Sequence, residues 1–193
     1  MGGIWERQIR SVRNVLTALL REHSSALSDE SFRTLLAEAE CIVNSRPLTV
    51  DNMDDPHSLP ISPSNILTLK TKVVLAPPGE FQRADLYCRK RWRQVQHLAN
   101  EFWSRWRKEF LQNLQARPKW TEKKRNFEIN DVVLIKDEDL PRNQWSLARI
   151  TKIFPDEKDG LDRKVQLYAP TSKSELQRPI HKLVLLVEGD MQH

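Results

Sequence analysis

Hydrophobic residues in the first 45 positions recur with the 3.6-residue period of amphipathic helices. No Gly or Pro interrupts residues 4–22, so we predict one helix there. A second helix is predicted over residues 29–45, because Ser28 or Asp29 can serve as its N-cap and Pro47 excludes helical backbone at the preceding residue. Two helices of this size cannot bury a satisfactory core alone. We expect them to need a sheet or a partner that this chain does not obviously supply.

The pattern changes twice after residue 46. Residues 47–80 hold six of the eleven prolines and predict an irregular, partly extended linker. Residues 81–116 return to a helical period, and Pro118 ends the predicted helix. Its apolar stripe consists of Trp92, Val95, Ala99, Phe102, Trp106 and Phe110. Such a stripe is more typical of packing than of a platform that stacks bases.

The last third of the chain has the two-residue period of strands. Five short apolar runs lie between residues 128 and 188, separated by turn residues, which predicts a small five-stranded antiparallel barrel. The expected fold class is therefore α+β. We divide the chain into a helix pair (1–46), a Pro-rich linker (47–80), a basic Trp-rich helix (81–125) and a β-barrel (126–190).

Charge is unevenly distributed. Positions 83–125 hold thirteen Lys and Arg against four Asp and Glu, a net charge of +9, whereas the whole chain carries only +5. Concentrated positive charge favours a polyanionic partner such as nucleic acid, because neutralised phosphates release counterions. A solvated helix that spaces two modules is the alternative.

Composition excludes several classes of protein. Five glycines and the absence of a phosphate-loop motif argue against a dinucleotide fold, and no zinc or hydrolase motif is present. The chain has no apolar run long enough to span a membrane and no secretory leader at Met1, so we expect no association with a membrane. We also expect no small-molecule substrate. Cys41 and Cys88 cannot form a disulfide framework, and we read them as buried free thiols in a reducing, intracellular compartment, with the nucleus plausible.

Glu6 is the one carboxylate whose neighbours suggest chemistry. Arg10 and Arg13 follow it at spacings of four and seven, so the three side chains share one face of the first helix. A carboxylate flanked by cations suits a divalent metal beside a phosphate backbone. An ordinary surface pair near a helix start is the more common explanation.

Several strings, taken in order, resemble one family. GGIWERQIRSVRNVL (2–16) resembles the last catalytic helix of integrases from Bel/Pao-type LTR retrotransposon polyproteins. EAECIVNSRPLT (38–49) and ISPSNIL (61–67) resemble the helix and the SP-containing segment that follow it. NDVVLIKDEDLPRNQWSLARITKIFP (130–155), DGLDRKVQLY (159–168) and RPIHKLVLL (178–186) resemble the SH3-like C-terminal domain. The resemblance implies that the helix pair is the end of an RNase H-like core.

The resemblance also assigns a role to Glu6, as the third carboxylate of a triad that binds two Mg²⁺ ions in the complete enzyme. The family's two aspartates precede this helix, and Met1 stands five residues before Glu6. We therefore expect no autonomous strand transfer, no cofactor for this chain, and a metal at Glu6 only if a full catalytic core is supplied.

The expected function is DNA binding through the basic helix and the SH3-like barrel, by phosphate contacts with little sequence specificity. The alternative is a protein–protein interaction module, with the long helix as a possible homo-oligomer interface. Arg178 and Lys182 could extend a positive rim, and Trp145 could instead plug one end of the barrel. The candidate nucleic-acid-binding residues are Arg7, Arg10, Arg13, Arg89, Lys90, Arg91, Arg93, Arg105, Arg107, Lys108, Lys123, Lys124, Arg125, Trp145 and Arg149.

Overall fold

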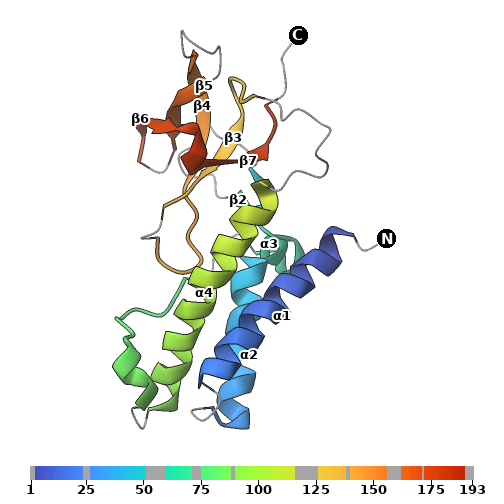
Figure 1. Cartoon of the computed structure of the whole chain (residues 1–193), viewed down its shortest axis with the longest axis vertical. Helices are drawn as coiled ribbons and strands as arrows, with labels where there is room; N and C mark the ends of the chain where they lie inside the picture. The colour runs from blue at the N-terminus through green and yellow to red at the C-terminus, as the bar shows by residue number, and fades with distance from the viewer. Residues whose placement is uncertain are drawn as a thin grey trace.

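The computed structural model describes residues 3–23, 27–50, 60–70, 75–87, 90–115, 126–137, 140–155, 162–170 and 172–189. Helices occupy one end of the molecule and a five-stranded sheet the other (Figure 1). The predicted α+β class is confirmed, with a small barrel-like sheet following the helices.

The two N-terminal helices form as the sequence predicts. Helix α1 spans Ile4–His23 and α2 spans Asp29–Asn44. The Ser28 hydroxyl caps α2 by accepting a hydrogen bond from the Ser31 N–H, and Ser45 ends it. Each helix turns an apolar stripe inward, including Leu19 of α1 and Leu35 and Ile42 of α2.

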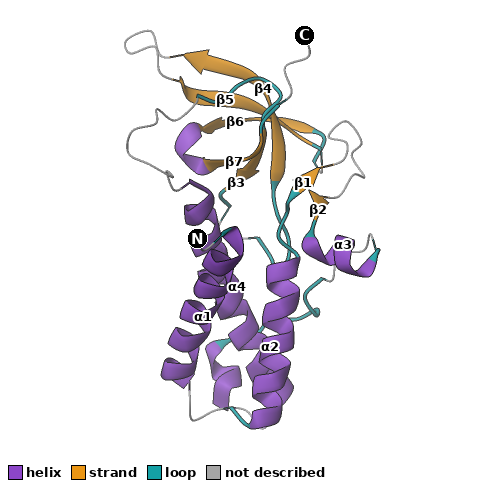
Figure 2. Ribbon diagram, turned by 90° about the vertical axis from the view of Figure 1, so that its right-hand side faces the viewer, coloured by secondary structure: helices purple, strands orange, loops and turns teal. Residues whose placement is uncertain are grey.

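A third helix in the same chain supplies their partner. Helix α4 (Arg91–Gln115) packs against both α1 and α2 and extends to the sheet (Figures 1 and 2). The expectation that α1 and α2 lack a partner within the chain was therefore wrong. Five of the six predicted stripe residues of α4 are buried, and Trp92 is half exposed. These five residues lie in the chain's own core.

The segment before α4 differs from the prediction of one helix over 81–116. A 3₁₀ turn, η2 (Arg83–Tyr87), precedes α4. Asp85 accepts a hydrogen bond from the Gln82 N–H and pairs with Arg93, so this segment turns back against the first turns of α4. Gly79 has φ +124°, a conformation that side chains other than glycine rarely adopt.

The described part of the linker is more regular than expected. Strands β1 (Thr49–Val50) and β2 (Pro60–Ile61) pair antiparallel. Helix α3 (Pro63–Thr68) follows, with Pro63 in its first turn and a capping box between Ser62 and Asn65. The predicted SP-containing segment is thus the start of a short helix.

The sheet contains the five predicted strands, in the spatial order β6-β5-β4-β3-β7 with every pair antiparallel. Their bounds are β3 Val132–Ile135, β4 Leu147–Pro155, β5 Asp162–Ala169, β6 Ser174–Pro179 and β7 Leu183–Val187. A 3₁₀ turn, η3 (Ile180–Lys182), joins β6 to β7. The concave side encloses a small core of side chains such as Ile150, Val165 and Leu167.

The sheet docks on α4 through its convex side. Leu134, Leu147 and Val184 belong to the same buried cluster as the helices. The loop between β3 and β4 adds a polar junction, in which buried Arg142 donates from Nη2 to Gln96 Oε1 at 2.6 Å. Gln96 in turn donates to Glu38 Oε1 at 2.7 Å. The loop that contains PRNQW (141–145) therefore links the sheet to α2 and α4 through these hydrogen bonds.

Candidate nucleic-acid interface

Two of the predicted cations of α4 are paired within the chain. Arg93 Nε donates to Asp85 Oδ1 at 2.7 Å, and its guanidinium lies 5.3 Å from the Phe81 ring centroid. Arg105 forms two hydrogen bonds to the Glu22 carboxylate, at 2.6 and 2.8 Å. These hydrogen bonds lower the pKa of Asp85 and of Glu22 below their ordinary values, so both pairs stay charged near neutral pH.

Arg107 and Trp145 lie inside the molecule. The Arg107 guanidinium is 5.7 Å from the Trp103 ring centroid and 5.8 Å from that of Trp145, and only 7% of the residue is exposed. Trp145 also packs edge-on against Trp103, Trp106 and Phe110, with centroids 5.0–6.2 Å apart. Trp145 therefore joins the sheet to α4, rather than plugging one end of the barrel or facing solvent.

Three predicted cations at the rim of α4 remain exposed. Arg91 lies 3.8 Å from Glu30 in a surface ion pair, which contributes little to stability. Lys90 is exposed just before the first residue of α4, and Lys108 is exposed about two turns before its end. Arg89, Lys123, Lys124 and Arg125 lie outside the described residues.

The predicted cations of α1 are all exposed. Glu6 occupies the first turn, and Arg7, Arg10 and Arg13 follow along the outside of the helix. Within the described residues, Glu6 belongs to no group of His, Cys, Asp or Glu that could hold a metal ion. The residues present around it do not fit a site for two Mg²⁺ ions.

Sequence reasoning missed a second exposed basic surface on the sheet. In β4, Ile150 points into the barrel core while Lys152 and Phe154 point outward. The side chains of β4 change their alternation between inward and outward at a bulge, because the pairing passes from Ile150–Leu167 directly to Lys152–Gln166. Thr151 is left out of the pairing, and its hydroxyl donates to the Gln166 carbonyl at 3.3 Å.

The outward residues form cross-strand pairs. Arg149 lies opposite Tyr168, Lys152 opposite Gln166, and Phe154 opposite Lys164. We call this surface the outer face (Arg149, Lys152, Phe154, Lys164, Gln166 and Tyr168).

The outer face combines charge with aromatic rings. Lys152 and Lys164 are exposed, and Lys152 Nζ lies 5.3 Å from the Phe154 ring centroid. Glu175 of β6 borders the surface and accepts a hydrogen bond from Gln166. Arg178 and Lys182 are exposed farther along β6 and η3. Cations beside partly exposed rings and an amide can contact both phosphates and bases.

We find no helical segment among the described residues with the length and apolar character needed to cross a lipid bilayer. The half-buried thiol of Cys41 has a raised pKa, chiefly because burial disfavours its thiolate.

One family model matches a stretch of the chain that includes both the long helix and most of the sheet. Residues 90–186, from the start of α4 into β7, match the model described as "Family of unknown function (DUF5641)". No significant match was found among curated proteins or solved structures. The matched stretch is half of the 193 residues and contains α4, the docking loop and the outer face. The chain therefore belongs to the DUF5641 family.

Proposed function

We propose that this chain binds DNA, largely without sequence specificity, through the outer face of its sheet. The observation that carries the proposal is the set of outward pairs on β4 and β5, which puts Lys152 and Lys164 beside Phe154. Lysines there contact phosphates, and Phe154 and Tyr168 contact bases or sugars. The exposed arginines of α1 offer a second set of phosphate contacts.

In this proposal α4 supports the interface without forming most of it. Arg93 and Arg105 are held by carboxylates, and Arg107 is buried between indole rings. A phosphate that replaced one of these partners would leave a carboxylate uncompensated or open the core. The net charge of the middle segment is therefore a poor guide to where DNA binds.

We further propose that the chain descends from a retroelement integrase and does not carry out strand transfer by itself. The order of the motifs along the chain supports the ancestry. The isolation of Glu6 from other candidate metal ligands in the described residues supports the lack of activity, because two divalent ions need several carboxylates. A Mg²⁺- or Mn²⁺-dependent strand-transfer assay tests this, and activity abolished by Glu6→Gln would refute it.

The binding proposal is tested by titrating labelled duplex and single-stranded oligonucleotides with the full chain at low and physiological salt. We expect micromolar or tighter binding that weakens as salt rises. Lys152→Glu combined with Lys164→Glu should weaken binding at least tenfold. The matched control is Arg33→Glu, which reverses an exposed charge on α2 and should leave affinity nearly unchanged. No binding at low salt, or equal losses for both variants, would overturn the proposal.

A second candidate, protein–protein interaction, is favoured by a groove of about 350 Å³ between α1 and the end of α2. Its walls are mainly apolar and include Ile9, Leu16, Leu20 and Val43. Analytical ultracentrifugation of wild type and of Leu16→Glu separates the two candidates. Self-association lost in Leu16→Glu, without any DNA binding by wild type, would favour this second function.

A further inference from the structure

Each cross-strand pair of the outer face joins a cation to a ring or to an amide: Arg149 to Tyr168, Lys152 to Gln166, and Lys164 to Phe154. Successive pairs lie two residues apart on β5, which is about 6.6 Å along the strand. Tyr168 and Phe154 therefore occupy the two ends of the row, about 13 Å apart along the strand direction. We propose that the outer face binds single-stranded DNA in preference to duplex DNA, with the strand lying along this row of pairs. This inference rests on the proposed DNA-binding role of the same surface.

The spacing of the pairs favours a single strand. Nucleotides on one strand of a duplex advance by only about 3.4 Å along the axis. The pairs are about twice as far apart, so they match a strand whose bases are unstacked and spread out. Within a duplex the flat faces of the bases are covered by their neighbours, whereas the faces of unstacked bases are open to an aromatic ring. Phe154 and Tyr168 can therefore stack on the bases of a single strand but not on those inside a duplex.

The two rings are not used by the core. Phe154 and Tyr168 are partly exposed, and within the described residues neither ring belongs to a buried hydrophobic cluster. Lys152 Nζ lies 5.3 Å from the Phe154 ring centroid, so a base stacked at this ring has a cation beside it. Stacking and a neighbouring cation are the two contributions by which proteins bind single strands without reading their sequence.

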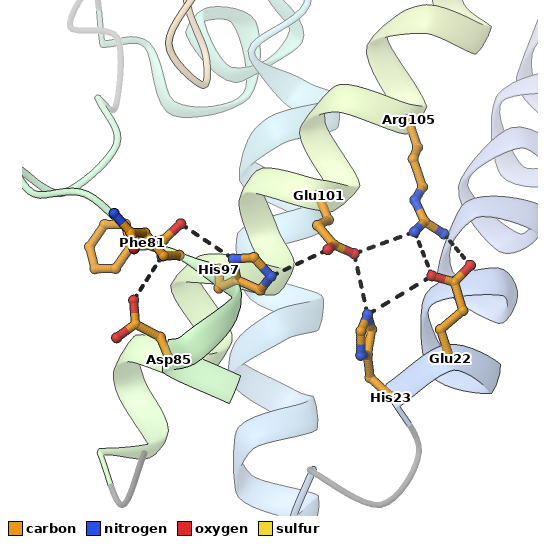
Figure 3. A network of polar contacts seen from close by, with 8 residues as sticks. Glu22, His23, Phe81, Asp85, His97, Glu101 and Arg105 are labelled. Carbon is orange, nitrogen blue, oxygen red and sulfur yellow. Dashed lines mark hydrogen bonds and ion pairs between the residues drawn. The ribbon is translucent and has the colours of Figure 1, made fainter. Parts of the chain in front are cut away.

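The lysines of the outer face are available to phosphates. On α4, by contrast, Arg105 is held between the carboxylates of Glu22 and Glu101 (Figure 3). Lys152 and Lys164 are exposed, and neither makes an ion pair with another described residue. A phosphate can therefore pair with either lysine without displacing a carboxylate.

Glu175 limits where the strand can lie. It is opposite Tyr168 in the pairing of β5 with β6, and its carboxylate accepts a hydrogen bond from Gln166 Nε2. The negative charge repels phosphates, so the backbone of a bound strand runs over β4 and β5 rather than over β6. Glu175→Gln keeps an acceptor for Gln166 and removes this repulsion, and it should strengthen binding of single strands several-fold.

The experiment measures the affinity of the full chain, by fluorescence anisotropy at physiological salt, for three labelled ligands of equal length. They are a deoxythymidine oligonucleotide, the same strand paired with its complement, and a strand that keeps the phosphates but has no bases. We expect the oligonucleotide with bases to bind at least tenfold more tightly than either of the others, because each stacked base contributes roughly a factor of ten. The strand without bases tests stacking with the wild-type protein, so its result does not depend on the folding of a variant.

Variants separate the rings from the charges. Phe154→Leu combined with Tyr168→Leu should weaken single-strand binding at least tenfold and change duplex affinity less than twofold. Tyr87→Leu, which removes an exposed ring on η2, is the matched control and should change neither. Duplex or the strand without bases bound as tightly as the single strand, or equal losses of both affinities in the ring variant, would overturn this inference and leave the proposed DNA binding standing. No binding of any ligand at low salt would overturn both.

Discussion

Arg142 carries a positive charge into the space between the helices and the sheet, where its side chain is 2% exposed. Its contacts are Gln96 at 2.6 Å and Glu38 at 3.6 Å. Burial lowers the pKa of Arg142, and the Glu38 carboxylate offsets part of that effect. The residue therefore stabilises the junction only while its partners remain in place.

Replacing Arg142 by methionine should lower the free energy of unfolding by about 3 kcal/mol, because the change leaves the partly buried Glu38 carboxylate uncompensated. Urea denaturation measures this. Arg33→Met, an exposed substitution on the same helix as Glu38, should change stability by less than about 0.5 kcal/mol. Equal effects of the two substitutions would show that the buried network contributes nothing.

Trp145 was predicted from the sequence to bind nucleic acid, and substitutions at this position test whether it instead stabilises the core. Trp145→Ala should lower the free energy of unfolding by about 3–5 kcal/mol, because it leaves a cavity beside Trp103, Trp106 and Phe110. Trp145→Phe should cost less, because the indole N–H makes no hydrogen bond. In both variants the folded protein should keep its affinity for DNA. A selective loss of DNA affinity at unchanged stability would contradict the packing role.

At the scale of elements, the ion pair between Glu22 and Arg105 links the last turn of α1 to the middle of α4. The hydrogen bonds from Arg105 lower the pKa of Glu22 below its ordinary value of 4.5. A carboxyl group whose pKa is lower in the folded state stabilises the fold above its unfolded pKa. That contribution is lost as the pH falls through the folded pKa.

Glu22→Gln should therefore be less stable than wild type at pH 6, and the difference should vanish at a pH well below 4.5. Urea unfolding of both proteins measures this difference in stability at each pH. A difference that stays constant across the pH range would mean that the ion pair does not cause it.

Elements whose signals lie within a short stretch of sequence could be predicted, whereas features that depend on contacts with other parts of the chain could not. The helical periods located α1, α2 and the buried stripe of α4, and alternation located the five strands, because these signals are local. The turn at Asp85 and the bulge at Thr151 depend on contacts that the period does not encode. The bulge decides that Lys152 and Phe154 point outward, so the outer face was missed. Strand alternation could have indicated Lys164, Gln166 and Tyr168.

The cations of α4 illustrate the same limit. The sequence shows how many charged residues the helix carries, but it does not show which of them are paired. Arg93 pairs with Asp85 and Arg105 with Glu22, and the partners lie eight or more positions apart in the sequence. Arg107 lies on the helical face that turns toward Trp145, a residue 38 positions later in the sequence. Exposure, not charge, therefore separates binding candidates from structural residues.

At the scale of the molecule, helices and sheet share one core. Leu134, Leu147 and Val184 of the sheet lie in the same cluster as Leu35 of α2 and Phe102 of α4. Removing the helices would expose the convex side of the sheet to water. The matched family stretch, which runs from α4 through the sheet, agrees with this shared core.

The shared core predicts that the chain unfolds as one cooperative unit. Tryptophan fluorescence reports mainly on the α4 region, and far-UV circular dichroism reports on all elements. The two signals should give the same urea midpoint within error. Separate midpoints would indicate that the sheet folds independently of the helices.

The salt dependence of DNA binding tests the central claim most directly, because it counts the phosphates that the outer face neutralises. Affinity for one duplex would be measured at several salt concentrations for wild type and for Lys152→Gln combined with Lys164→Gln. We expect the slope of log K against log salt to become less negative by about two in the double variant, one for each lysine. An unchanged slope, with binding intact, would place the DNA elsewhere on the molecule and contradict the account.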